Sequence, residues 1–308
     1  GVHSTGKGII SMLIALLIDQ KKLDLDEFVS SYWPEFKGDG KEEIKVRTLL
    51  SHQGGMYAWR EKVHEDDFHN WSYVVELLEK QSPLHKPNEL ICYHPKTIGF
   101  LVGELIRRIT KKTIGEFLKE QISIPLNVEC FIGTPEVYHD NIATLISAPS
   151  LRKAFSDPKN IDEYTLVSFL NPGNRTKTAN TKEYRLAEIP ALNCHSNSKS
   201  LAQIYDYFLN SDFISRETFD QVTSIEVKGE DQVMKRPMQW SPIGFSIGGG
   251  KLFGKSNLSF GHTGWGGSMA FADPENNLSI SYTMNMLTGS MLGDQRALSL
   301  VETTYKNL

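Results

Sequence analysis

The chain has 308 residues, 40% hydrophobic and 23% charged, so it carries enough apolar side chains for one large domain or two closely packed subdomains. Lysine and arginine number 33 against 37 aspartate and glutamate, which gives a formal charge of −4 and no basic stripe that a nucleic acid would bind. The longest apolar run, residues 9–18, is well short of the roughly 20 residues that cross a bilayer, so no membrane span is predicted.

The first segment with a clear pattern is residues 4–20, STGKGIISMLIALLIDQ, where apolar residues occupy nearly every face after Gly8. This pattern predicts a helix that is buried all round. Residues 21–36 alternate acidic and apolar side chains and are expected to connect around one short helix. Residues 44–50 lead into the pair Gly54-Gly55, which ends the element and allows a sharp turn.

Residues from about 60 to 235 carry mainly helical signals. The clearest helices are predicted at residues 96–110, 114–121 and 200–209. Between them, residues 171–188 are polar and lack periodicity, so they are expected to form a surface excursion that borders a site.

The pattern changes after Pro237, where short apolar runs alternate with turn signals. The predicted strands are residues 243–247, 258–262, 268–272 and 278–284, and residues 291–307 are predicted to form a closing helix. Late strands between an early buried helix and a closing helix predict an α+β fold. In it, helices flank an antiparallel sheet and a mostly helical subdomain is inserted.

Ser4 and Lys7 form an S-x-x-K motif at the head of the buried helix. Their spacing places the hydroxyl and the ammonium on one helix face. Burial and the positive helix N-terminus both disfavour a charged Lys7, so it becomes able to take the Ser4 proton, as in a Ser–Lys nucleophile. The alternative is Ser4 as a helix N-cap and Lys7 as a solvated first-turn residue. The motif also occurs at Ser150/Lys153, Ser156/Lys159 and Ser196/Lys199.

Tyr93 belongs to the loop Cys92-Tyr93-His94-Pro95, directly before the predicted helix at 96–110. A loop tyrosine in this place can direct its phenol into a cleft, and a neighbouring cation that lowers its pKa would make it a proton shuttle. The alternative is a packing residue with a satisfied hydroxyl.

A glycine-rich stretch, FGHTGWGGSM, covers residues 260–269 at the end of a predicted strand. Glycines let the backbone approach a ligand closely, so an edge strand here could offer N–H groups to a developing oxyanion. The alternative is a hairpin turn whose glycines serve geometry only.

Together, and in this order, the three motifs resemble the serine beta-lactamase-like superfamily. It includes class C beta-lactamases, D,D-peptidases, family VIII-type esterases and mitochondrial LACTB-like proteins. The resemblance extends over nearly the whole chain, including LLSHQGG at residues 49–55 and GHTGWGGSMAFADPENNLSISYTMN at residues 261–285. It implies a beta-lactamase/transpeptidase-like fold in one catalytic domain over residues 1–308.

In that domain, residues of about 1–58 and 236–308 would form the α/β part and residues of about 59–235 the mainly helical part. Relatives place strands of the central sheet before the nucleophile helix. Because Ser4 lies so near the first residue of this chain, we expect those N-terminal strands to be absent from it.

The resemblance also implies roles for single residues. Ser4 would be the acyl-accepting nucleophile, Lys7 its general base, and Tyr93 the residue that shuttles a proton to the leaving group. His262, Thr263 and Gly264 would stand where many members have Lys-Thr-Gly. The backbone N–H groups of Ser4 and Trp265 would form the oxyanion hole. His52, in the LLSHQGG stretch, matches no catalytic position and is expected to be structural.

Two departures from the family pattern favour ester hydrolysis. The second motif is usually Tyr-x-Asn, but here the third place is Pro95, which has no amide to hold a substrate amide group. His262 replaces a lysine, so the permanent cation that would bind a substrate carboxylate is lost near neutral pH. The expected enzyme is therefore a serine hydrolase of small esters; the alternatives are a beta-lactamase or D,D-peptidase-like amide hydrolase.

A different class of function is a catalytically silent scaffold or filament-forming protein, since LACTB-like relatives assemble. The four chemical groups of Ser4, Lys7, Tyr93 and His262 argue against it. A classical α/β-hydrolase needs a G-x-S-x-G elbow, which does not occur. The predicted partner is a small-molecule ester or amide, with no metal or cofactor and a homo-oligomer as an open option. The three cysteines lie far apart and are expected to be buried, reduced thiols.

Overall fold

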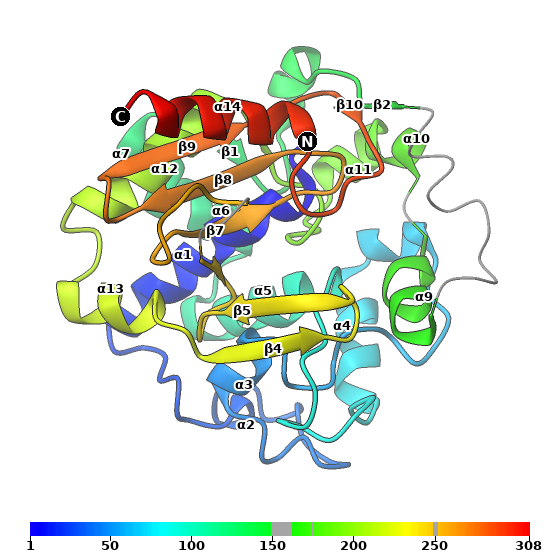
Figure 1. Ribbon diagram of the computed structural model, residues 1–308. Coiled ribbons are helices and arrows are strands. Elements are labelled where there is room, and N and C mark those ends of the chain that lie inside the picture. Colours follow the sequence, from blue (N-terminus) through cyan, green and yellow to red (C-terminus); the bar gives the residue numbers. More distant parts are fainter. Residues whose placement is uncertain (149–161, 174, 249–251) are drawn as a thin grey trace.

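A six-stranded antiparallel sheet forms the centre of the molecule (Figure 1). The computed structural model describes residues 1–148, 162–173, 175–248 and 252–308. Within them the strand order is β4-β5-β6-β7-β8-β9, so each strand pairs with its neighbours in sequence. The strands are β4 (Val227–Asp231), β5 (Arg236–Trp240), β6 (Ser246–Ile247), β7 (Phe260–Thr263), β8 (Met269–Asp273) and β9 (Leu278–Tyr282).

The predicted α+β class and the meander of the last four strands are confirmed. β4 lies within residues of about 59–235, which were expected to be mainly helical, and β5 follows directly after them; neither strand was predicted. The sequence of β4, VKGED, holds one apolar residue, and β5 contains Pro237, which a sequence reading excludes from central strands. These strands form because they pair with each other along their full length.

Helices cover both faces of the sheet. The side chains of β8 alternate: Met269 and Phe271 pack against α14 (Gln295–Lys306), whereas Ala270 and Ala272 belong to the main core. The main core also contains α1 (Gly6–Asp19) and α12 (Ser198–Asn210), and α12 packs on β8 and β9. Figure 1 shows α14 lying along these strands on the outer side.

Helix α1 is buried over most of its length, as its sequence predicts. Every residue from Gly6 to Leu17 is buried. Since no polar face is left, neighbours must cover the helix on all sides: α5 (Thr97–Thr110), α6 (Ile114–Leu118) and α13 (Arg216–Val222) contact it in addition to the sheet. None of the described helices is long and apolar enough to cross a membrane.

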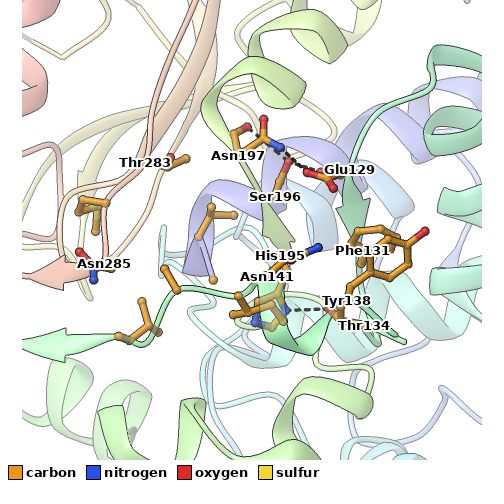
Figure 2. A pocket seen from close by; sticks show the side chains of 16 residues that line it. Glu129, Phe131, Thr134, Tyr138, Asn141, His195, Ser196, Asn197, Thr283 and Asn285 are labelled. Carbon is orange, nitrogen blue, oxygen red and sulfur yellow. Dashed lines mark hydrogen bonds between the residues drawn. The ribbon is translucent and has the colours of Figure 1, made fainter. Parts of the chain in front are cut away.

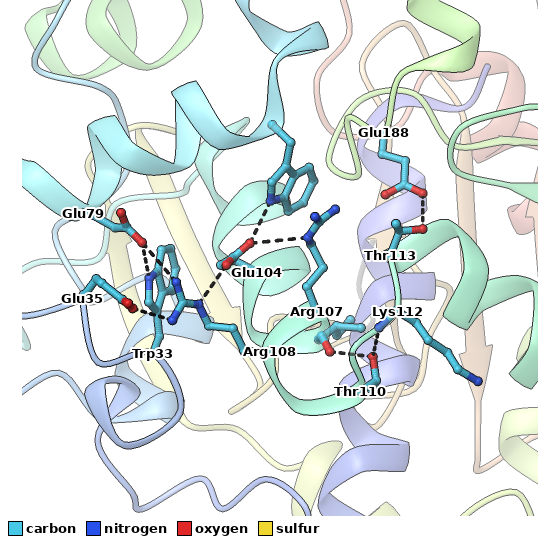
Figure 3. A network of polar contacts seen from close by, with 12 residues as sticks. Trp33, Glu35, Glu79, Glu104, Arg107, Arg108, Thr110, Lys112, Thr113 and Glu188 are labelled. Atoms are coloured by element: carbon cyan, nitrogen blue, oxygen red, sulfur yellow. Dashed lines mark hydrogen bonds and ion pairs between the residues drawn. The ribbon is translucent and has the colours of Figure 1, made fainter.

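Helix α5 is held in place by a polar network around Arg108 (Figure 3). The Arg108 guanidinium pairs with Glu35, with Glu79 of α4 (Trp71–Lys80) and with Glu104 one turn earlier in α5. Glu79 also accepts a hydrogen bond from the Trp33 indole at 2.6 Å. The network joins three segments at the C-terminal end of α5.

The polar stretch at 171–188 is partly helical, which corrects the expectation of an irregular excursion. It contains α10 (Thr176–Ala179) and α11 (Lys182–Leu186), and Tyr184 is buried. The remaining described elements are short: η1 (His3–Thr5), α2 (Val29–Tyr32), α3 (Val46–Leu50), η2 (Glu65–His69), the π-helix η3 (Lys119–Ser123), α7 (Ile124–Leu126), β1 (Cys130–Phe131), η4 (Glu136–Asn141), β2 (Ile146–Ser147), α9 (Glu163–Leu170), β3 (His195–Ser196) and β10 (Met286–Leu287).

Candidate active site

Ser4 lies in η1, a single 3-10 turn directly before α1. The Val2 N–H donates to the Cys194 carbonyl at 2.9 Å, and a Cβ at Gly6 would overlap the Cys194 side chain. The turn therefore packs tightly against the segment around Cys194. The N-cap of α1 is Thr5, so Ser4 is not the helix N-cap that the alternative interpretation required.

Lys7 is 3% exposed, which contradicts the alternative of a solvated lysine. Its Nζ donates to Ser4 Oγ at 2.7 Å, to the Pro95 carbonyl at 2.8 Å and to the Ala191 carbonyl at 3.0 Å. Burial lowers the pKa of Lys7 well below its ordinary value, and the charge of Lys96 adds to the shift. A neutral amine would donate both N–H groups to the carbonyls and direct its lone pair at the Ser4 hydroxyl.

Tyr93 is buried between Lys7 and Trp240. The Lys7 Nζ lies 5.2 Å from the centre of the Tyr93 ring, and the Trp240 ring stacks on it at 5.4 Å with an interplanar angle of 5°. Burial raises the pKa of the Tyr93 phenol, with the Ser4 hydroxyl acting in the opposite sense. The expectation of a lowered pKa was therefore wrong, and Tyr93 carries its proton at neutral pH.

His262 lies in β7 on the same side as Tyr93, with 5.9 Å between the two ring centres. Its Nδ1 lies 2.7 Å from the Thr263 carbonyl, which can only accept, so Nδ1 carries the proton. Burial lowers the pKa of His262 to about 3, and the charge of Lys7 adds to the shift. The imidazole is therefore neutral over the physiological pH range.

The glycine-rich turn between β7 and β8 is hydrogen-bonded through Ser268 to the segment Val2–Thr5, which holds Ser4. The Ser268 Oγ donates to the Val2 carbonyl at 2.8 Å and lies 2.8 Å from Thr5 Oγ1. The Gly264 carbonyl accepts from the Gly267 N–H at 3.1 Å. Because a trans peptide directs its C=O and N–H oppositely, the Trp265 N–H points out of this turn.

β7, which ends at Thr263, contacts η1, and Trp265 follows in the turn after the strand. The Trp265 ring makes an edge contact with His3 at 5.5 Å, and Thr263 Oγ1 donates to the Met291 carbonyl at 3.3 Å. The structure thus brings Ser4, Lys7, Tyr93 and His262 together with the turn that follows His262.

Sequence reasoning missed two residues of this region, Trp240 and Asp231, and expected only a structural role for a third, His52. The His52 ring lies 5.0 Å from the Tyr93 ring and 4.5 Å from that of Trp240, so it packs beneath the candidate proton shuttle. Asp231 is fully buried and accepts hydrogen bonds from the Tyr93 N–H at 3.1 Å and the Trp240 indole at 3.3 Å. No local signal marks Asp231, because it lies 138 residues from Tyr93.

Of the other S-x-x-K matches, Ser196/Lys199 lies within the described residues and has no such arrangement. Ser150/Lys153 and Ser156/Lys159 lie outside the described residues. Ser196 lies in β3, and Asn197 rather than Ser196 caps α12. The three cysteines are free and buried, as expected, and the Sγ atoms of Cys130 and Cys194 lie 3.8 Å apart.

A cavity of about 330 Å³ lies beside the nucleophile turn (Figure 2). It extends from Val2 to β1 and β3, and its wall includes a hydrogen bond of 2.9 Å between Thr134 and His195. Ser4, Lys7, Tyr93 and His262 are not among its lining residues. In the described part of the chain, no three histidine, cysteine, aspartate or glutamate side chains are grouped so that they could hold a metal ion.

Comparison with known proteins shows the family and the fold of this chain. The family model described as Beta-lactamase matches residues 1–303. The chain is 26% identical to the esterase/beta-lactamase LipL of Mycobacterium tuberculosis, over 94% of this chain and 70% of LipL. A family VIII carboxylesterase structure is 30% identical with a TM-score of 0.92, and a penicillin-binding protein homologue from Caulobacter crescentus is 30% identical with a TM-score of 0.91. Each of the two alignments covers 100% of this chain and 83% of the chain in the solved structure.

Proposed function

This chain belongs to the beta-lactamase family and is a serine hydrolase of that fold, and on this premise we propose that it hydrolyses small carboxylic esters through an acyl-enzyme on Ser4. The observation that carries the proposal is the set of partners around Lys7. Two carbonyls and the Ser4 hydroxyl surround its amine. The lone pair of a neutral Lys7 therefore points at the hydroxyl proton that Ser4 must lose when it attacks the ester.

In the proposed reaction, Ser4 Oγ attacks the ester carbonyl carbon while Lys7 takes the hydroxyl proton. Negative charge develops on the carbonyl oxygen, which the N–H groups of Ser4 and Trp265 would stabilise. The Tyr93 phenol gives its proton to the leaving alkoxide, so the alcohol is released. Tyr93 then regains a proton from Lys7. Water then attacks the acyl-Ser4 carbonyl and yields the acid and free Ser4, so one ester and one water are consumed.

His262 and Pro95 support esters over substrates that carry a carboxylate or a recognised amide. His262 is buried and neutral where many family members have a lysine, so it supplies no cation for a substrate carboxylate. Pro95 offers only its carbonyl, which Lys7 already occupies. The family VIII carboxylesterase among the similar structures supports ester hydrolysis, and LipL is named both an esterase and a beta-lactamase.

Labelling with a fluorophosphonate tests the nucleophile. We expect one phosphonyl adduct by intact-mass measurement, located on Ser4, and none on Ser4→Ala. An unmodified native protein would contradict the proposal.

A matched pair of p-nitrophenyl esters, one neutral and one ending in a carboxylate, tests the substrate class. We expect kcat/KM to be at least about 10-fold higher for the neutral ester, because a carboxylate has to be desolvated without a cation at His262. In His262→Lys the ratio should move toward the charged ester. Rapid turnover of the beta-lactam nitrocefin by the native protein would favour beta-lactam hydrolysis instead.

A further inference from the structure

A second buried lysine, Lys96, stands at the end of the Tyr93 loop. It is 1% exposed and directly precedes α5. Its Nζ donates to the carbonyls of Ser168, Phe169 and Pro172, the first two at 3.0 and 2.8 Å. Ser168 and Phe169 belong to the last turn of α9, where carbonyls have no partner within the helix. Lys96 thus supplies hydrogen bonds to the unpaired carbonyls at the C-terminal end of α9 and links this helix to the Tyr93 loop.

The partners of the two buried lysines differ in one chemical respect. All three partners of Lys96 are carbonyls, which accept hydrogen bonds and never donate them. Only an ammonium has three N–H groups to offer them. Lys7 has two carbonyls and the Ser4 hydroxyl, which can donate, so a neutral amine satisfies that site as well as an ammonium does.

The two amines lie in one buried neighbourhood. Lys7 donates to the carbonyl of Pro95, the residue directly before Lys96. Two like charges in a low-dielectric interior repel each other, so one of the two lysines gives up its proton more readily. The carbonyls around Lys96 decide which one it is.

The directions of the pKa shifts agree with this. Burial lowers the pKa of Lys96 to about 7, with the charge of Glu65 acting in the opposite sense. The pKa of Lys7 is lowered well below its ordinary value, and Lys96 is the charge that adds to burial there. Several other titratable groups face Lys7 or lie in or against the Tyr93 loop: His3, His52, Tyr57, His85, Cys92, Tyr93, His94, His262 and Asp231.

We propose that Lys96 is a positioning residue: it holds the positive charge of this buried pair and thereby keeps Lys7 in its neutral, proton-accepting form. The proposal rests on the proposed function, in which Lys7 is the base for Ser4. The three N–H groups of Lys96 donate to carbonyls of α9 and of the loop after it. Lys96 therefore acts on the reaction only through the charge state of Lys7.

The pH dependence of kcat/KM for a neutral p-nitrophenyl ester tests the proposal. In Lys96→Gln the charge is gone, Lys7 holds its proton more tightly, and the acid limb should move up by about one pH unit. Activity should recover at higher pH. Lys96→Arg keeps the charge and should keep the acid limb of the native protein.

Lys41 provides the matched control. It is also 1% exposed and donates to three carbonyls, those of Leu78, Glu79 and Gln81, at the end of α4. Lys41→Gln should lower the melting temperature as Lys96→Gln does but leave the acid limb in place. An acid limb that stays fixed in Lys96→Gln, or that moves equally in Lys41→Gln, would overturn the proposal.

A measurement on the native protein covers the case in which Lys96→Gln does not fold. With lysine labelled by carbon-13 at Cε, the shift of each buried lysine reports whether its amine is charged, and the Lys7 signal is identified by its loss in Lys7→Met. Near pH 6 we expect a neutral Lys7 and a charged Lys96; the reverse would sink the proposal. A native protein with no esterase activity and no Ser4 adduct would instead reject the proposed function.

Discussion

At the scale of single residues, the chemistry of Lys7 depends on backbone carbonyl groups rather than on other side chains. The carbonyls of Pro95 and Ala191 hold its amine and leave one position for Ser4 Oγ. Any residue could supply those carbonyls, so only their placement matters. Backbone geometry and burial thus prepare Lys7 for the role of base in the proposed reaction.

Replacing the lysine amine tests this arrangement. Lys7→Met keeps the length of the side chain but removes the proton acceptor, so kcat/KM for a p-nitrophenyl ester should fall at least about 100-fold. The rate of fluorophosphonate labelling should fall in parallel. Lys80→Met, which removes an exposed lysine of α4, should leave both rates unchanged. A threefold loss or less in Lys7→Met would mean that another group takes the Ser4 proton.

At the scale of elements, α1 can approach its neighbours closely because two of its first residues are glycines. A Cβ at Gly6 would overlap Cys194, and a Cβ at Gly8 would overlap the Tyr205 hydroxyl on α12. The short distance between α1 and α12 is needed because both helices pack on the same sheet. Gly6, inside the S-x-x-K motif, and Gly8, directly after it, therefore let α1 pack closely, and Ser4 lies directly before this packed helix.

Helix α12 gives a test of this close packing. Gly8→Ala should lower the free energy of unfolding by about 1–3 kcal/mol, because the methyl group displaces Tyr205. Tyr205→Phe in the same chain removes the overlapping oxygen and should recover part of the loss, as measured by urea denaturation. Gly173→Ala, where a Cβ meets no atom within 4 Å, serves as the control. No recovery in the double variant would show that α1 shifts as a whole.

At the scale of the whole molecule, the core contains histidines that stay neutral in the folded state. Burial lowers the pKa of His3, His94 and His262 to about 3, and the ordinary value is 6.5. The unfolded chain therefore binds more protons than the folded one between these values. Stability is complete above pH 6.5 and declines as the pH falls toward 3.

This linkage predicts acid sensitivity of the folded state. Each of these three histidines should cost about 1.4 kcal/mol at about pH 5.5, and His52 and His195, whose pKa values burial also lowers well below 6.5, add to this. Urea unfolding should therefore show a loss of at least about 4 kcal/mol relative to about pH 7.5. His94→Gln can still donate to the Cys92 carbonyl and accept from the Met56 N–H, as the His94 ring does. It should reduce the pH dependence by one histidine's share. A urea midpoint that is the same at both pH values would contradict the prediction.

Local patterns in the sequence were sufficient for the architecture around the nucleophile. The buried helix α1, the strands from β6 to β9 and the closing helix α14 are all marked by hydrophobic periodicity and turn residues within a few positions. The hairpin of β4 and β5 has no such mark in the sequence, because pairing between the two strands, rather than apolar side chains, stabilises it.

The sequence by itself determined the fold class, the order of the motifs and the pair Ser4–Lys7, since these depend on residues that are neighbours along the chain. Only the tertiary structure decided the chemical state of the site. The carbonyls that hold Lys7 come from 88 and 184 residues away, and the carboxylate of Asp231 reaches Tyr93 across 138 residues. Burial, which sets the pKa of Lys7, Tyr93 and His262, exists only once these distant segments have packed together.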